Sequence, residues 1–178
     1  MSQVSKLNMV NSKLGATMPG QQTTRYIYDT VVTAAGQSQF NFFQTFAGKT
    51  DLQTNLTTNK LDSSESMVIK SIYFVTNITP GLAGHSNLNI TVGNQVVLKD
   101  FNVSFNSTNR GLAFDRLHSG TNDAFFVEVR LLTDIVIPPQ VNFKATLEIA
   151  EGAAVLEAQS MTIGLKGYGT IFSAGSTF

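Results

Sequence analysis

The strongest constraint on this chain is an alternation of apolar and polar residues that returns along most of its length. Successive side chains of a β-strand point to opposite faces of a sheet, so each alternating segment has one dry face and one wet face. A helix would instead repeat its apolar residues every three to four positions. The alternation predicts antiparallel strands in segments 39–42, 87–92, 100–106, 125–131 and 141–149.

Three further segments, 24–33, 67–76 and 161–172, are rich in β-branched and aromatic residues but alternate less cleanly. The total is about eight short strands. This number predicts an all-β fold, an antiparallel two-sheet sandwich connected as a single jelly roll. Residues 1–24 are polar and show no sustained period, so we expect an N-terminal arm over 1–24 and the jelly-roll domain over 25–178.

Glycines indicate two places where the backbone is expected to form a bulge, a close approach or a tight turn. Gly164, Gly167 and Gly169 lie in the last expected strand, where glycine often indicates a bulge or a close approach of another chain segment. Gly93 and Asn94 lie between two apolar-patterned runs. This dipeptide position predicts a tight β-hairpin turn.

The charge content favours association over a free monomer. The chain has 12 basic and 12 acidic residues, a net charge of zero, and only 13% charged residues, about half the usual quarter. Soluble monomers normally keep their net charge away from zero, which prevents association. Cysteine is absent, which excludes disulfides and thiolate zinc sites. The composition favours permanent assembly, with an ordinary neutral monomer as the alternative.

No motif predicts a catalytic, cofactor or metal site. Gly48-Lys49-Thr50 resembles the end of a phosphate-binding loop, but the glycine required five residues earlier is replaced by Phe43. The two histidines, His85 and His118, lack acidic or histidine neighbours at metal-ligand spacing. A serine hydrolase elbow is also absent. We therefore expect no enzyme activity and no cofactor, although a sugar-hydrolysing carboxylate pair remains an open alternative.

Phenylalanine supplies the candidate contact residues. The adjacent pairs Phe42-Phe43 and Phe125-Phe126 each place one ring on either face of a strand. The inward ring fills the core, and the outward ring either contacts another subunit or is covered within the monomer. Aromatic residues also occur near the C-terminus. The candidate contacts between subunits are Phe43, Phe126, Phe172 and Phe178.

Several short motifs resemble single jelly-roll virion proteins of bacterial viruses. They are TRYIYDT at 24–30, FFQTFAGKTDLQTNL at 42–56, SMVIKSIYFV at 66–75 and IGLKGYGTIF at 163–172. The second contains the element K-T-x-x-x-T-N, which occurs before such a strand in phage coat and head proteins of this type. The resemblance implies two four-stranded sheets, assembly as trimers or pentamers in a closed shell, no catalytic site and no cofactor.

The expected function is that of a coat subunit that assembles with copies of itself and with other virion proteins. The basic residues of the arm are only Lys6, Lys13 and, at its end, Arg25. These are too few cations for strong electrostatic binding of nucleic acid. The arm suits a shell facing an inner lipid layer or another protein, or a decorating protein outside the shell. With no apolar leader in MSQVSKLNMV, we expect assembly in the host cytoplasm and residence in the virion. The alternative is a receptor- or glycan-binding β-sandwich, such as a spike or fibre head, with its site in loops 48–66 and 80–86.

Overall fold

The computed structural model describes residues 20–32, 34–76, 86–102, 115–117, 124–149 and 160–172. All regular structure in these ranges is β. The strands are β1 (Gly20–Val32), β2 (Gln39–Phe42), β3 (Glu65–Thr76), β4 (Ser86–Val92), β5 (Gln95–Asn102), β6 (Asp115–Leu117), β7 (Ala124–Ile137), β8 (Phe143–Ile149) and β9 (Ser160–Phe172).

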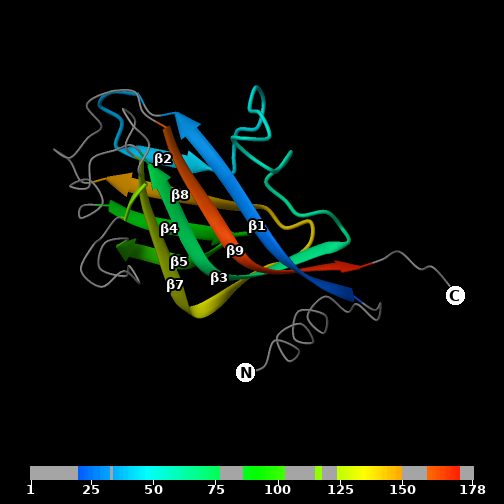
Figure 1. Cartoon of the computed structure of the whole chain (residues 1–178). Helices are drawn as coiled ribbons and strands as arrows, with labels where there is room; N and C mark the ends of the chain where they lie inside the picture. The colour runs from blue at the N-terminus through cyan, green and yellow to red at the C-terminus, as the bar shows by residue number, and fades with distance from the viewer. Residues whose placement is uncertain are drawn as a thin grey trace, which may run out of the picture.

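The strands form two antiparallel sheets that face each other (Figure 1). One sheet has five strands in the order β1-β9-β3-β7-β6, and the other has four in the order β2-β8-β4-β5. With short β6 set aside, the pairs are β1 with β9, β2 with β8, β3 with β7 and β4 with β5. In chain order, the first strand therefore pairs with the last, the second with the second-last, and the remaining strands pair in the same way. This is the jelly-roll connection. The predicted all-β jelly roll is confirmed.

The core lies between the two sheets and is rich in large aromatic residues. Phe40, Phe42, Phe43 and Phe143 are all buried, and the rings of Phe43 and Phe143 lie 5.3 Å apart in a tilted arrangement. Aliphatic residues of the five-stranded sheet, such as Ile27 in β1, complete the cluster from the other side. Each buried side chain of this size contributes roughly 1.5–3 kcal/mol through loss of apolar surface from water.

Glycine acts in β9 and at the hairpin as the sequence predicts. A Cβ on Gly167 would lie 1.9 Å from the carbonyl oxygen of Val68, beside the register shift between Ile69 and Ser71 of β3. Gly93 has a φ of 61° and occupies the turn between β4 and β5. At both positions the backbone geometry therefore requires glycine.

The structure differs from the expectation in three respects. β1 begins at Gly20 and pairs with β9 from its first residue, so residues 20–24 belong to the sheet and not to the arm. The first sheet has five strands and not four, because β6 adds to the edge beside β7. The strand expected over 100–106 is instead β5, which ends at Asn102, and residues 103–106 lie outside the described ranges.

Candidate interaction surface

All four tyrosines of the chain lie on the outer face of the five-stranded sheet. In β1, Ile27 is buried in the core, so its neighbours Tyr26 and Tyr28 point outward. Cross-strand pairing then places the other two on the same face: Thr24 lies opposite Tyr168, and Tyr28 and Tyr73 both lie opposite Gly164. We call Tyr26, Tyr28, Tyr73 and Tyr168 the tyrosine face.

Gly164 allows the Tyr73 ring to lie directly over β9. A Cβ at position 164 would lie 1.9 Å from Cζ of Tyr73, so the Tyr73 ring occupies the space above the glycine. Burial raises the pKa of Tyr73, and the nearby hydroxyls of Tyr28 and Tyr26 raise it further. Tyr73 is therefore a neutral hydrogen-bonding group at physiological pH. Tyr26 remains 46% exposed at the edge of the cluster.

A lysine and a glutamate beside the tyrosine face are paired within the chain. Lys166 Nζ lies 3.5 Å from Glu128 Oε1 and 5.8 Å from the centre of the Tyr26 ring. Glu128 Oε1 also accepts a hydrogen bond from the Ser71 hydroxyl at 2.8 Å. A paired charge costs less to bury against another molecule than a free one. This face combines exposed aromatic area with partly compensated charge, as protein interfaces do.

The outer face of the four-stranded sheet has a different character. It carries amides and hydroxyls, and several of them bond to each other: Thr146 Oγ1 lies 3.1 Å from Asn41 Oδ1. Asn89 Oδ1 accepts a hydrogen bond from the backbone N–H of Asp100 at 2.8 Å. The two sheets therefore present one aromatic and one strongly hydrated surface. Of the two, the aromatic one is the better candidate for contact with a protein.

The free edge of β1 is covered by the chain itself. Residues 53–55 run beside it: Thr30 N–H donates to Gln53 O at 2.7 Å, and Asp29 and Thr54 form an antiparallel bridge. The Asn55 side chain accepts from Tyr28 N–H at 3.0 Å and donates to Tyr26 O at 2.6 Å. An uncovered edge of this kind would pair with another strand. This half of β1 is therefore closed to such pairing.

An internal ion pair fixes the same loop against the core. Asp29 in β1 is completely buried, and its two carboxylate oxygens accept from Lys49 Nζ at 2.6 Å and from Phe43 N–H at 2.7 Å. Lys49, the lysine of the phosphate-loop-like triplet, thus serves the loop that follows β2. The Tyr28 hydroxyl adds a hydrogen bond to the carbonyl of Asp51. The loop is held at several points along β1.

The other sheet has a more exposed edge at β5. In the four-stranded sheet β5 pairs only with β4. Val96 and Val97, which point to opposite faces, are 54% and 41% exposed. An edge strand with exposed β-branched residues is suited to pairing with another chain. It is a second candidate contact, smaller than the tyrosine face.

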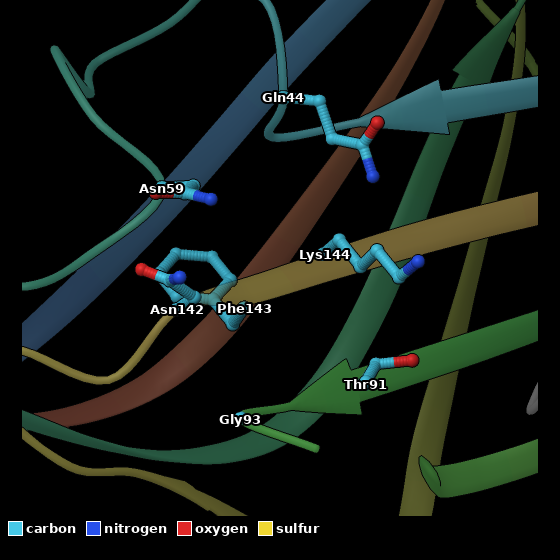
Figure 2. Close-up of a pocket in the computed structure, with 7 residues that line it drawn as sticks. All are labelled: Gln44, Asn59, Thr91, Gly93, Asn142, Phe143 and Lys144. Carbon is cyan, nitrogen blue, oxygen red and sulfur yellow. The ribbon is translucent and has the colours of Figure 1, made fainter. Parts of the chain in front are cut away.

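A polar groove opens at one end of the four-stranded sheet (Figure 2). Its volume is about 410 Å³. Gln44, Lys144 and Thr91 come from neighbouring strands β2, β8 and β4 or their ends, and Thr91 lies directly opposite Lys144 in the register. The loops at this end of the sheet close the other side. The complete lining is Gln44, Asn59, Thr91, Gly93, Asn142, Phe143 and Lys144.

The structure places the predicted contact residues in different environments or does not describe their side chains. Phe43 is wholly buried together with Phe42, so the expectation that one ring of this pair faces outward is wrong. Its φ of 61° turns the chain at the end of β2 and brings both rings to the core. Phe126 lies in β7 and Phe172 in β9, and the structure describes the backbone of these two residues but not their side chains. Phe178 lies outside the described residues.

Sequence reasoning missed the tyrosine face, although a signal was present. Tyr26 and Tyr28 are two residues apart, so they share a face of any strand that contains them. Ile27 between them is apolar, which makes the core face identifiable. The contributions of Tyr73 and Tyr168 depend on which strands are neighbours. That information appears only in the fold.

The described residues were also compared with what a metal site or a membrane-spanning helix requires. In them no group of three or more His, Cys, Asp and Glu residues is placed to hold a metal ion. Both histidines considered above lie outside the described ranges. Across the same ranges, no helix has the length and apolar character required to cross a membrane.

The chain shows distant structural similarity to two solved structures. No family model and no curated protein sequence matches the chain. A chain of a Nora virus structure is similar with a TM-score of 0.29 and 8% identity, covering 89% of this chain but 64%, less than two thirds, of that one. A chain of the empty head of turnip yellow mosaic virus has a TM-score of 0.26 and 12% identity, covering 88% and 85%. The jelly-roll assignment accordingly depends on the strand order.

Proposed function

We propose that the chain is a coat (capsid) subunit that assembles with symmetry-related copies into a viral shell, and that it has no catalytic role. The observation that carries the proposal is the tyrosine face. Tyrosine supplies a large rigid ring and a hydroxyl that stays hydrogen-bonded in a partly wet contact, so it is enriched at protein interfaces. Four such residues on one outer face support burial against another subunit.

The charge distribution supports the same role. The molecule has no net charge, so copies of it do not repel each other at long range. Near the tyrosine face, Lys166 is paired with Glu128, and Lys70 lies 2.8 Å from Asp134. Their desolvation on assembly is therefore partly compensated. The resemblance of the sequence motifs extends the proposal to a bacterial virus and to trimers or pentamers within the shell.

The test is the assembly state of the full-length purified protein. We expect mass photometry and electron micrographs to show closed particles of defined symmetry, formed alone or after addition of the other virion proteins. A chain that stays monomeric at high concentration and is absent from particles in both conditions would overturn the proposal. Particles formed only with a separate shell protein would instead identify a decorating subunit.

A further inference from the structure

We infer that the polar groove of Figure 2 is a binding site for an acidic sugar, meaning a pyranose that carries a carboxylate. This function goes beyond shell formation and uses a different surface. The tyrosine face belongs to the five-stranded sheet, whereas the groove lies at the end of the four-stranded sheet. The two roles can therefore be tested separately.

The walls of the groove are held in place by backbone hydrogen bonds. Phe143 N–H donates to the carbonyl of Asn59 at 2.9 Å, which ties the long loop after β2 to the start of β8. Gly93 N–H donates to the carbonyl of Asn142 at 2.7 Å, which ties the β4–β5 turn to the same place. The backbone donors are used to build the walls. The side chains are thus presented from a fixed frame, which lowers the entropy lost on binding.

The polar side chains that line the groove have no partners in the described part of the chain. There, none of the five lining side chains that carry polar atoms makes a hydrogen bond or an ion pair. Elsewhere on the same sheet, Asn41 and Thr146 bond to each other, and Asn89 bonds to the backbone. These five groups lie together at one concave site. They are Gln44, Asn59, Thr91, Asn142 and Lys144.

The charge of the groove selects an anion. Lys144 is its single ionisable lining residue, and no carboxylate lines it. Most described lysines are instead paired: Lys49 with Asp29, Lys70 with Asp134, Lys99 with Asp100 and Lys166 with Glu128. An unpaired ammonium beside neutral amides favours a ligand with one negative charge.

The remaining groups select a polyhydroxylated ligand. Each of the amides of Gln44, Asn59 and Asn142 offers both donors and an acceptor, and the Thr91 hydroxyl does the same, which matches sugar hydroxyls. Phosphate carries close to two negative charges and would need more positive charge than the one lysine of the groove supplies. An extended peptide would need free backbone groups, and the backbone N–H groups of Phe143 and Gly93 already donate within the chain. The volume of about 410 Å³ is sufficient for one or two sugar rings.

Saturation-transfer difference NMR tests this site, because it observes ligand protons and works for free subunits and for assembled particles. The probes are D-glucuronate, methyl glucoside and acetate, with inorganic phosphate as a competitor. We expect saturable glucuronate binding in the millimolar range, with methyl glucoside and acetate at least about tenfold weaker. The substitution Lys144→Met should reduce the glucuronate affinity about tenfold, to the level of the neutral sugar.

The control is Lys99→Met, which removes one exposed lysine on β5 outside the groove and should leave binding unchanged. Absence of glucuronate binding to both subunits and particles would overturn the inference. Equal loss in the two lysine variants, or displacement of glucuronate by an equal concentration of phosphate, would also overturn it. Each of these results leaves particle formation, measured on the same samples, as a separate test of the coat function.

Discussion

At the scale of single residues, Asp29 is the one charged side chain buried among the described residues. Its partner Lys49 is held 2.6 Å away, with 14% of its side chain exposed. Taking two charges out of water is costly, and the pair is tolerated because each charge compensates the other and Phe43 N–H adds a hydrogen bond. The arrangement joins β1, the end of β2 and the following loop in one place.

Lys49→Met should therefore destabilise the fold more than loss of an ordinary surface lysine. It leaves the Asp29 carboxylate buried without a counter-charge, and we expect a loss of about 3–5 kcal/mol in the free energy of unfolding, measured with urea. The double variant Asp29→Asn with Lys49→Met should recover part of this loss, since it removes both charges. Lys99→Met, which breaks an exposed pair 3.9 Å apart, is the control and should cost less than about 1 kcal/mol. A Lys49→Met protein as stable as the control would contradict this account.

At the scale of elements, the alternating pattern located strands well where one face is dry and the other wet. β2 and β8 show this in their burial, with Phe40 and Phe42 inside and Gln39 and Asn41 exposed. β5 was misplaced because its alternation changes phase. Asp100 has a φ of 48°, and Leu98 and Phe101 both pack toward the core although they are three positions apart, an odd spacing that alternation would place on opposite faces.

The loop at 53–55 shows a limit of a different kind. Its sequence is polar and indicates only a loop, because nothing local reveals that Asn55 will replace a neighbouring strand along β1. The same holds for the groove, whose lining comes from two strands, β4 and β8, and from three loops far apart in the sequence. Strand positions follow from local pattern, whereas these sites depend on which segments become neighbours.

Asn55→Ala should expose one part of the β1 edge and leave the rest covered. The Tyr28 amide loses its acceptor, so its hydrogen exchange should become about tenfold faster, as expected for loss of one such bond. The Thr30 amide should keep its protection, because Gln53 O remains in place through the loop that Lys49 and Asp29 hold. Exchange measured by NMR compares the two amides within one protein. A similar acceleration at Thr30 would show that the loop leaves the edge as a whole.

At the scale of the whole molecule, the two outer faces differ in character, and in the proposed shell one serves association while the other stays hydrated. The five-stranded sheet carries the tyrosines, and the four-stranded sheet carries amides, hydroxyls and the groove. One half of the β1 edge is closed by the chain's own loop, while β5 keeps exposed valines. A subunit built this way would join copies mainly through a sheet face, with β5 as a secondary contact. The opposite face stays available to other ligands.

Tyr26→Glu tests this division directly, because Tyr26 is exposed in the monomer and lies beside Lys166 on the tyrosine face. The new carboxylate would be buried on assembly while its neighbour Lys166 is already paired with Glu128, so we expect at least about a hundredfold weaker association, measured by sedimentation across a concentration series. Unfolding of the monomer should change little, since surface substitutions are usually within about 0.5 kcal/mol. The matched control, Asn87→Glu on the exposed outer face of β4, should assemble as the unsubstituted chain does. If Asn87→Glu blocks assembly and Tyr26→Glu does not, the contact surface is the four-stranded sheet, and the tyrosines serve another purpose.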